Sequence, residues 1–126
     1  MSTNKQLLFK DNLTFNTSGI NLTVRRGVKK FSIGDKVDIV DADNRFNKVD
    51  NEGKLYYDIT KPIALYLAEI TGVKILNFYD LTNTDLIFEH VESCHNVNGL
   101  FDVMSKLYPD FDGREIVTLI YFKILV

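Results

Sequence analysis

The sequence predicts an α+β protein, built as a small mixed β-barrel with two or three short flanking helices. Several segments alternate apolar and polar residues, as half-buried strands do. Two segments between residues 82 and 108 instead space their apolar residues as helices do, and an apolar, strand-like segment follows them. Strands, then two short helices, then one strand pack most simply as a sheet that curls on itself with the helices at one side.

The composition narrows the class of protein. The chain has 126 residues, of which 45% are hydrophobic and 12% aromatic, so we expect a single domain, residues 1–126, with one well-packed core. The net charge of -2 argues against broad binding of duplex DNA. Cys94 is the one cysteine, so no intramolecular disulfide can form, and the sequence shows neither a signal peptide nor a membrane-spanning segment. We therefore expect a cytoplasmic protein that makes no membrane contact.

The first half of the chain is expected to form strands joined by polar turns. Residues 11–19 are rich in Asn, Thr and Ser, which favour turns over helix interiors. Residues 43–53 form a polar loop or hairpin tip, and Pro62 ends the strand that follows it. The predicted strands of this half are residues 6–9, 20–26, 36–41 and 55–59.

A long β-rich segment, residues 63–78, comes next. Gly72 interrupts it, which predicts a bend or bulge in a strongly curved strand. Thr82 is a good N-cap for a short helix, and Asp85, three residues later, resembles the second member of a capping box. We expect about two helical turns, ending near His90.

A second helix is predicted over residues 99–108, and Pro109 ends it. The last strand is predicted over residues 115–126. Because side chains alternate along a strand, one face of it should carry Val117, Leu119 and Tyr121.

Four cationic residues lie within six positions of this mildly acidic chain: Arg25, Arg26, Lys29 and Lys30. Such a cluster suggests a site for phosphate or carboxylate groups, for instance an electrostatic rim along a nucleic-acid backbone. The alternative is a solvated turn, which is the commoner role of a charge run. Arg25 shares one face of its strand with Thr23.

Two interpretations fit Arg25. Its guanidinium can bind a phosphate or a base edge inside a cleft, or it can form a structural ion pair with a buried carboxylate such as Glu69 or Glu89. Glu89 itself lies at the predicted end of the first helix, where the helix dipole disfavours a carboxylate, and this placement suggests a functional role. The aromatic residues considered as a stacking platform for a base are Tyr56, Tyr57, Tyr66, Phe78 and Tyr79.

We predict neither a metal site nor a cofactor. Acidic, His and Cys residues crowd together in residues 89–95. The spacing of His90, Cys94 and His95 nevertheless matches no standard zinc pattern, and we interpret the segment as a polar loop.

Several short motifs carry a family resemblance. They are Thr23-Val24-Arg25 followed by Gly34-Asp35, Ala68-Glu69-Ile70 followed by Val73, Asp80-Leu81-Thr82 leading to Glu89-His90, and Leu107-Tyr108-Pro109 before residues 117–122. In order and spacing they resemble the ASCH domain of the PUA-like superfamily, over most of the chain. The resemblance implies a PUA-like β-barrel with a cleft across its mouth that binds RNA or a modified nucleoside or nucleotide.

By the same resemblance, Thr23, Arg25 and Glu89 would line the cleft. One branch of the family, similar to this chain in length, removes acyl groups from N4-acylated cytidine with a Lys, a Thr and a Glu. Thr23 and Glu89 match two of these catalytic residues, but Ile20 stands in place of the lysine. Because a threonine hydroxyl needs a base to become nucleophilic, we favour RNA or nucleotide binding. The alternatives are an amidohydrolase or a ribonuclease, and a protein-interaction module with an inert cleft.

Overall fold

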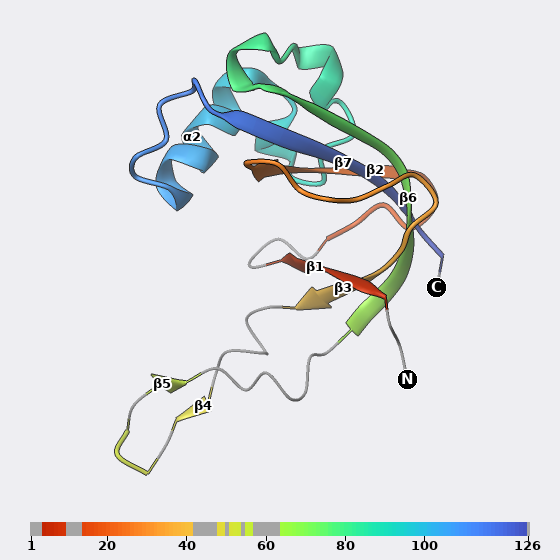
Figure 1. Ribbon diagram of the computed structural model, residues 1–126, viewed down its shortest axis with the longest axis vertical. Coiled ribbons are helices and arrows are strands. Elements are labelled where there is room, and N and C mark those ends of the chain that lie inside the picture. The colour runs from red at the N-terminus through yellow and green to blue at the C-terminus, as the bar shows by residue number, and fades with distance from the viewer. Residues whose placement is uncertain are drawn as a thin grey trace.

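The computed structural model describes residues 4–9, 14–41, 48–49, 51–53, 55–56 and 64–125. These residues form an α+β protein whose main sheet curls into a half-barrel, with a helix beside one end of it (Figure 1). The predicted α+β class and the curled mixed sheet are confirmed, but the sheet forms a half-barrel, and the described residues contain one α-helix. The helix is α2 (Val97–Leu107), and the strands are β1 (Lys5–Phe9), β2 (Ile20–Arg26), β3 (Lys36–Asp41), β4 (Lys48–Val49), β5 (Leu55–Tyr56), β6 (Ala64–Asn77) and β7 (Ile116–Ile124).

The main sheet is mixed, with the strand order β1-β3-β6-β7-β2. β1 runs parallel to β3, and the other neighbouring strands are antiparallel. β1 and β2 are therefore the two edges. β4 and β5 form a separate antiparallel pair, which contains the start of the strand predicted over residues 55–59. The rest of that prediction, and most of the predicted loop over residues 43–53, lies outside the described residues.

β6 is the long curved strand that the sequence predicts. Its register with β7 shifts between Ile70 and Gly72, which confirms the predicted bulge. Glycine suits this place because a Cβ atom on residue 72 would lie 3.3 Å from the ring of Tyr121. The curl brings the two edges close enough for Arg25 on β2 to bond the carbonyl of Leu8 on β1.

Two hydrophobic clusters lie on opposite faces of the sheet, and β7 contributes to both. Val117 and Leu119 face the helical side, with Tyr121 packed against that cluster, as the predicted alternation requires. Ile120 and Phe122 point the other way, into the concave side of the curl. The first cluster fixes α2 to the sheet, and the second fills the half-barrel.

The helix predicted from Thr82 to His90 is wrong in length. The structure has a single 3₁₀ turn, η2 (Asn83–Leu86). Its start is as predicted, because Thr82 and Asp85 form a complete capping box. After the buried Leu86, the backbone bonds to the edge of β2, and those bonds replace the ones that a longer helix would need.

The second predicted helix is confirmed as α2, which begins two residues earlier than expected. The side chain of Asn96 caps its first turn by accepting a hydrogen bond from the Gly99 amide. Leu100 and Met104 are buried against the sheet. Short 3₁₀ turns, η1 (Phe78–Asp80) and η3 (Glu92–Cys94), complete the helical side. Within the described parts of the chain, no helix has the length and apolarity needed to cross a membrane.

Candidate functional site

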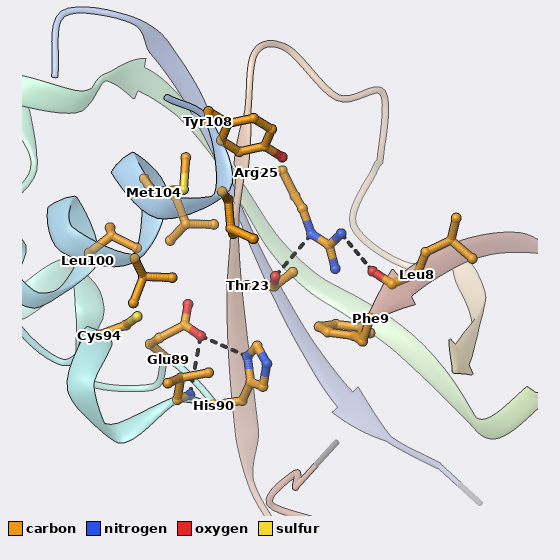
Figure 2. Close-up of a pocket in the computed structure, with 14 residues that line it drawn as sticks. Leu8, Phe9, Thr23, Arg25, Glu89, His90, Cys94, Leu100, Met104 and Tyr108 are labelled. Atoms are coloured by element: carbon orange, nitrogen blue, oxygen red, sulfur yellow. Dashed lines mark hydrogen bonds and ion pairs between the residues drawn. The ribbon is translucent and has the colours of Figure 1, made fainter. Parts of the chain in front are cut away.

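A pocket of about 300 Å³ lies at the edge strand β2, between α2 and the end of β1 (Figure 2). Most of its wall is apolar and comes from α2 and the segment before it. Thr23, Arg25 and Glu89 supply polar groups to this one pocket, although Glu89 is far from the other two in the sequence. The structure therefore brings together the three residues that the sequence analysis singled out for a cleft.

Arg25 lies across the gap between the two edge strands. Its Nε donates a hydrogen bond to Thr23 Oγ1 at 3.1 Å, and its Nη1 donates to the carbonyl of Leu8 at 2.7 Å. The guanidinium carbon stands 4.6 Å from the centre of the Phe9 ring. Nη2 has no hydrogen-bond partner among the described residues, so one end of the guanidinium is available to a ligand.

The structural ion pairs considered for Arg25 are not formed. Glu69 pairs instead with Lys36 and with Lys123 on the neighbouring strand. Burial lowers the pKa of the Arg25 guanidinium, while electrostatic interactions with Tyr108 and, to a smaller extent, with the Glu89 carboxylate partly offset that effect. Arg25 thus carries a charge in a partly desolvated place without a bonded counter-ion among the described residues.

Glu89 is buried, and its two carboxylate oxygens have different surroundings. Oε1 accepts a hydrogen bond from the Val91 amide at 3.3 Å and lies 2.7 Å from Nδ1 of His90. That ring nitrogen also lies 3.2 Å from the carbonyl of Leu22. Because both neighbours of Nδ1 are acceptors, it carries the proton. Oε2 has no partner among the described residues, and Figure 2 shows it directed toward the space beside α2.

A single β-bridge holds Glu89 in place. Leu22 donates its amide hydrogen to the Phe88 carbonyl at 2.8 Å, and its own carbonyl accepts from the His90 amide at 3.2 Å. Glu89 is therefore not at a helix end, and the argument from the helix dipole was wrong for this residue. Its position comes from pairing with an edge strand.

Arg26 points to the opposite face of β2 and is already occupied. Its Nε bonds Glu115 at 2.7 Å, and its Nη2 bonds Asp110 at 2.9 Å. These two carboxylates raise the pKa of the guanidinium. The Arg26 side chain also covers the ring of Tyr108, with 4.9 Å between the guanidinium carbon and the ring centre. This arginine fastens the loop after α2 to the sheet.

Lys29 and Lys30 are exposed on the turn that follows β2. Their recorded contacts are made by the backbone. The Lys29 amide bonds Thr118 Oγ1, and the Lys30 carbonyl accepts from the ammonium group of Lys5. Neither lysine lines the pocket, so any role at the site would be at its rim.

Cys94 lines the pocket but is a poor nucleophile. Burial, with a smaller contribution from the Glu89 carboxylate, raises the pKa of its thiol to about 11. Nearby, His95 Nε2 lies 2.7 Å from the Glu89 carbonyl, so this ring donates to the backbone. Among the described residues, no group of three or more His, Cys, Asp or Glu side chains is placed to hold a metal ion.

The aromatic residues of the pocket are ones that the sequence analysis did not select. Phe9 and Tyr108 line it, and His90 stands beside Glu89. Of the aromatic residues proposed as platforms, Phe78 is in the core and Tyr66 packs against the concave cluster. Tyr79 is exposed away from the pocket lining, while the side chains of residues 56 and 57 lie outside the described parts. Tyr108 is the last residue of the predicted second helix, directly before Pro109.

In the part of the chain that the structure describes, no lysine takes the place of the one that is missing from the matched motif. Ile20 pairs across the sheet with Lys123, but the ammonium group of Lys123 is directed to Glu69 at 3.8 Å. Among the described residues that line the pocket, none is a lysine. Comparisons with protein-family models, curated proteins and solved structures find no significant match for the chain.

Proposed function

We propose that this protein binds single-stranded RNA, or a nucleotide, by taking one base into the pocket at the edge of β2. The observation that carries the proposal is the meeting of Thr23, Arg25 and Glu89 in one pocket with otherwise apolar walls. Apolar walls suit the faces of a base, and a few fixed polar groups suit its edge.

The charges of the pocket favour a base over a phosphate. The available donor is Nη2 of Arg25, and the available acceptor is Oε2 of Glu89. A phosphate would gain from the arginine but would be repelled by a buried carboxylate. A neutral heterocycle that carries both donors and acceptors can use both groups.

Phosphates would then lie at the rim, near Lys29 and Lys30, where exposed ammonium groups attract a nucleic-acid backbone. Arg26 is left out of this interface, because Asp110 and Glu115 already bind its guanidinium. Of the four basic residues in the cluster, three would therefore contact the ligand: Arg25 would bind the base, and Lys29 and Lys30 would attract the phosphates.

The curled sheet and the single long helix are compatible with the small barrel of a PUA-like ASCH domain, to which the sequence motifs are similar. We propose binding rather than amide hydrolysis, because none of the described residues that line the pocket is a lysine that could activate the Thr23 hydroxyl. The same hydroxyl already accepts a hydrogen bond from Arg25, which suits a role in positioning that arginine.

The test is binding of a short single-stranded RNA of mixed sequence, followed by fluorescence anisotropy at low salt. We expect the variant Arg25→Ala/Lys29→Ala/Lys30→Ala to bind at least about thirtyfold more weakly than the wild type. The matched control is Lys36→Ala/Lys74→Ala/Lys123→Ala, which removes the same charge from lysines outside the pocket. Equal affinity of the two triple variants would refute the proposal.

A further inference from the structure

The edge of β2 that faces the pocket has a regular backbone pattern. In an antiparallel pair, alternate residues turn their N–H and C=O groups toward the partner strand and away from it. Leu22 bonds outward, to Phe88 and His90, whereas the amide of Gly27, directly after β2, bonds inward, to Ile116 of β7. The backbone N–H and C=O groups of the odd-numbered β2 residues therefore point toward β7. Those of the even-numbered residues point toward the open edge.

The segment around Glu89 occupies only one rung of that edge. It bonds Leu22 and then leaves the strand, because the chain turns into η3 directly after Val91. The next outward rung is Val24, which lines the pocket. No backbone segment among the described residues bonds Val24 on this side.

Charged groups flank this empty rung on both sides. Figure 2 shows Thr23 and Arg25 on one side of β2, and Glu89 with α2 on the other. A flat ligand placed against the edge of the strand would meet the Val24 backbone at its middle. It would have the guanidinium at one end and the free carboxylate oxygen at the other.

We propose that Val24 binds the ligand through its own N–H and C=O, as an extended residue binds its partner across a sheet. This contact rests on the proposed function and defines the chemistry of the ligand. The ligand would be a ring whose edge carries a hydrogen-bond donor next to an acceptor. The Watson–Crick edges of the four standard bases have this pattern. Recognition by these two backbone groups therefore selects for an unpaired, unblocked base edge and not for one base.

A peptide strand is the competing occupant of a sheet edge, and the geometry disfavours it. Strand addition uses several successive rungs. Here the rung at Leu22 is filled, and β2 ends at Arg26. Between Leu22 and the end of β2, the outward rung that lines the pocket is the one at Val24, which suits a single ring.

The Val24 donor can be removed by itself. Proline lacks the N–H, and an edge strand tolerates it where that N–H points away from the sheet. We expect Val24→Pro to bind the mixed RNA about tenfold more weakly than Val24→Ala, which loses the side chain but keeps the donor. Ile20→Pro is the matched control, because Ile20 is also outward-facing on β2 but does not line this pocket, and it should bind as the wild type does.

Backbone amide exchange in the unmodified protein gives a second measurement. Without ligand, Val24 should exchange faster than Thr23 and Arg25, whose amides bond β7; RNA should slow its exchange. The ligand side is tested with the four nucleoside monophosphates, each beside an analogue in which methylation removes every N–H at the donor nitrogen: N1-methyl for guanine, N3-methyl for uracil, N6,N6-dimethyl for adenine and N4,N4-dimethyl for cytosine. We expect the methylated forms to bind about tenfold more weakly.

The outcomes separate this inference from the proposed function. Equal binding by Val24→Pro and Val24→Ala, or unchanged Val24 exchange with bound RNA, overturns the backbone contact while RNA binding stands. Binding of a peptide with protection of Val24, and no binding of RNA or nucleotides, overturns both in favour of a protein partner. Equal binding of the methylated analogues also overturns the proposed edge recognition.

Discussion

Arg25 and Arg26 are neighbours on β2, yet their surroundings differ in almost every respect. Arg26 bonds two carboxylates and covers an aromatic ring, so its charge is neutralised within the protein. Arg25 bonds a hydroxyl and a carbonyl and keeps an unused nitrogen beside a pocket. The difference teaches that adjacent positions in a basic cluster can have separate roles, because a strand sends successive side chains to opposite faces.

Single substitutions should separate the two arginines most clearly. We expect Arg25→Ala to weaken RNA binding by about 2 kcal/mol, or roughly thirtyfold, because charge-assisted hydrogen bonds to the ligand are lost. Arg26→Ala should instead lower the temperature of unfolding and leave the affinity of the folded protein near that of the wild type. Anisotropy and thermal unfolding of both variants make the measurement. A larger loss of affinity for Arg26→Ala would reverse the assignment.

The variant Glu89→Gln tests whether a base or a phosphate occupies the pocket beside Arg25. If a base donates to the free oxygen, the neutral amide should weaken binding about tenfold, because the charge-assisted bond is lost. If a phosphate enters the pocket, removing the carboxylate should strengthen binding instead. The sign of the change, measured with the same RNA, therefore decides between the two occupants.

Acid pH should weaken the Arg26 contacts and leave those of Arg25 unchanged. Hydrogen bonding to Arg26 holds the pKa of Asp110 below its usual range. A carboxyl group whose pKa is lowered by folding stabilises the protein at pH values above its pKa in the unfolded chain, which is near 4. This stabilisation is lost as the pH falls through the pKa of the folded protein. The difference in unfolding free energy between wild type and Arg26→Ala should therefore shrink from about pH 6 to pH 3. The corresponding difference for Arg25→Ala should change less, because its hydrogen-bond partners are a carbonyl and a hydroxyl, which do not titrate there. Urea unfolding across this range measures both differences.

Local patterns predicted much of the fold. The bounds of β2 and β3 agree with the predicted strands, because alternation and flanking turns depend only on nearby residues. The bulge near Gly72 and the Thr82–Asp85 capping box were also readable, since each has a specific chemical signature at short range. These are features in which the residue type itself limits the backbone.

The site was less predictable, because its contacts are distant in sequence or involve the backbone. No short-range sequence pattern indicates that the backbone around Glu89 bonds to Leu22 instead of continuing a helix. The partner of Arg25 is the carbonyl of Leu8, and every residue type offers such an acceptor. Phe9 likewise joins the pocket only because the sheet curls. The motifs indicated which residues would meet, but not what holds them there.

The pairing of β2 with β7 also has a consequence for the order of folding. The two strands are separated by about ninety residues, and β7 is the neighbour that holds β2 in the main sheet. At ribosomal rates of about 5–20 residues per second, β2 would wait roughly 5–20 s for this partner to be synthesised. Its two arginines would remain outside the sheet during that interval. A nascent chain stalled before residue 116 should therefore lack the pocket, even though Thr23, Arg25 and Glu89 have all been made.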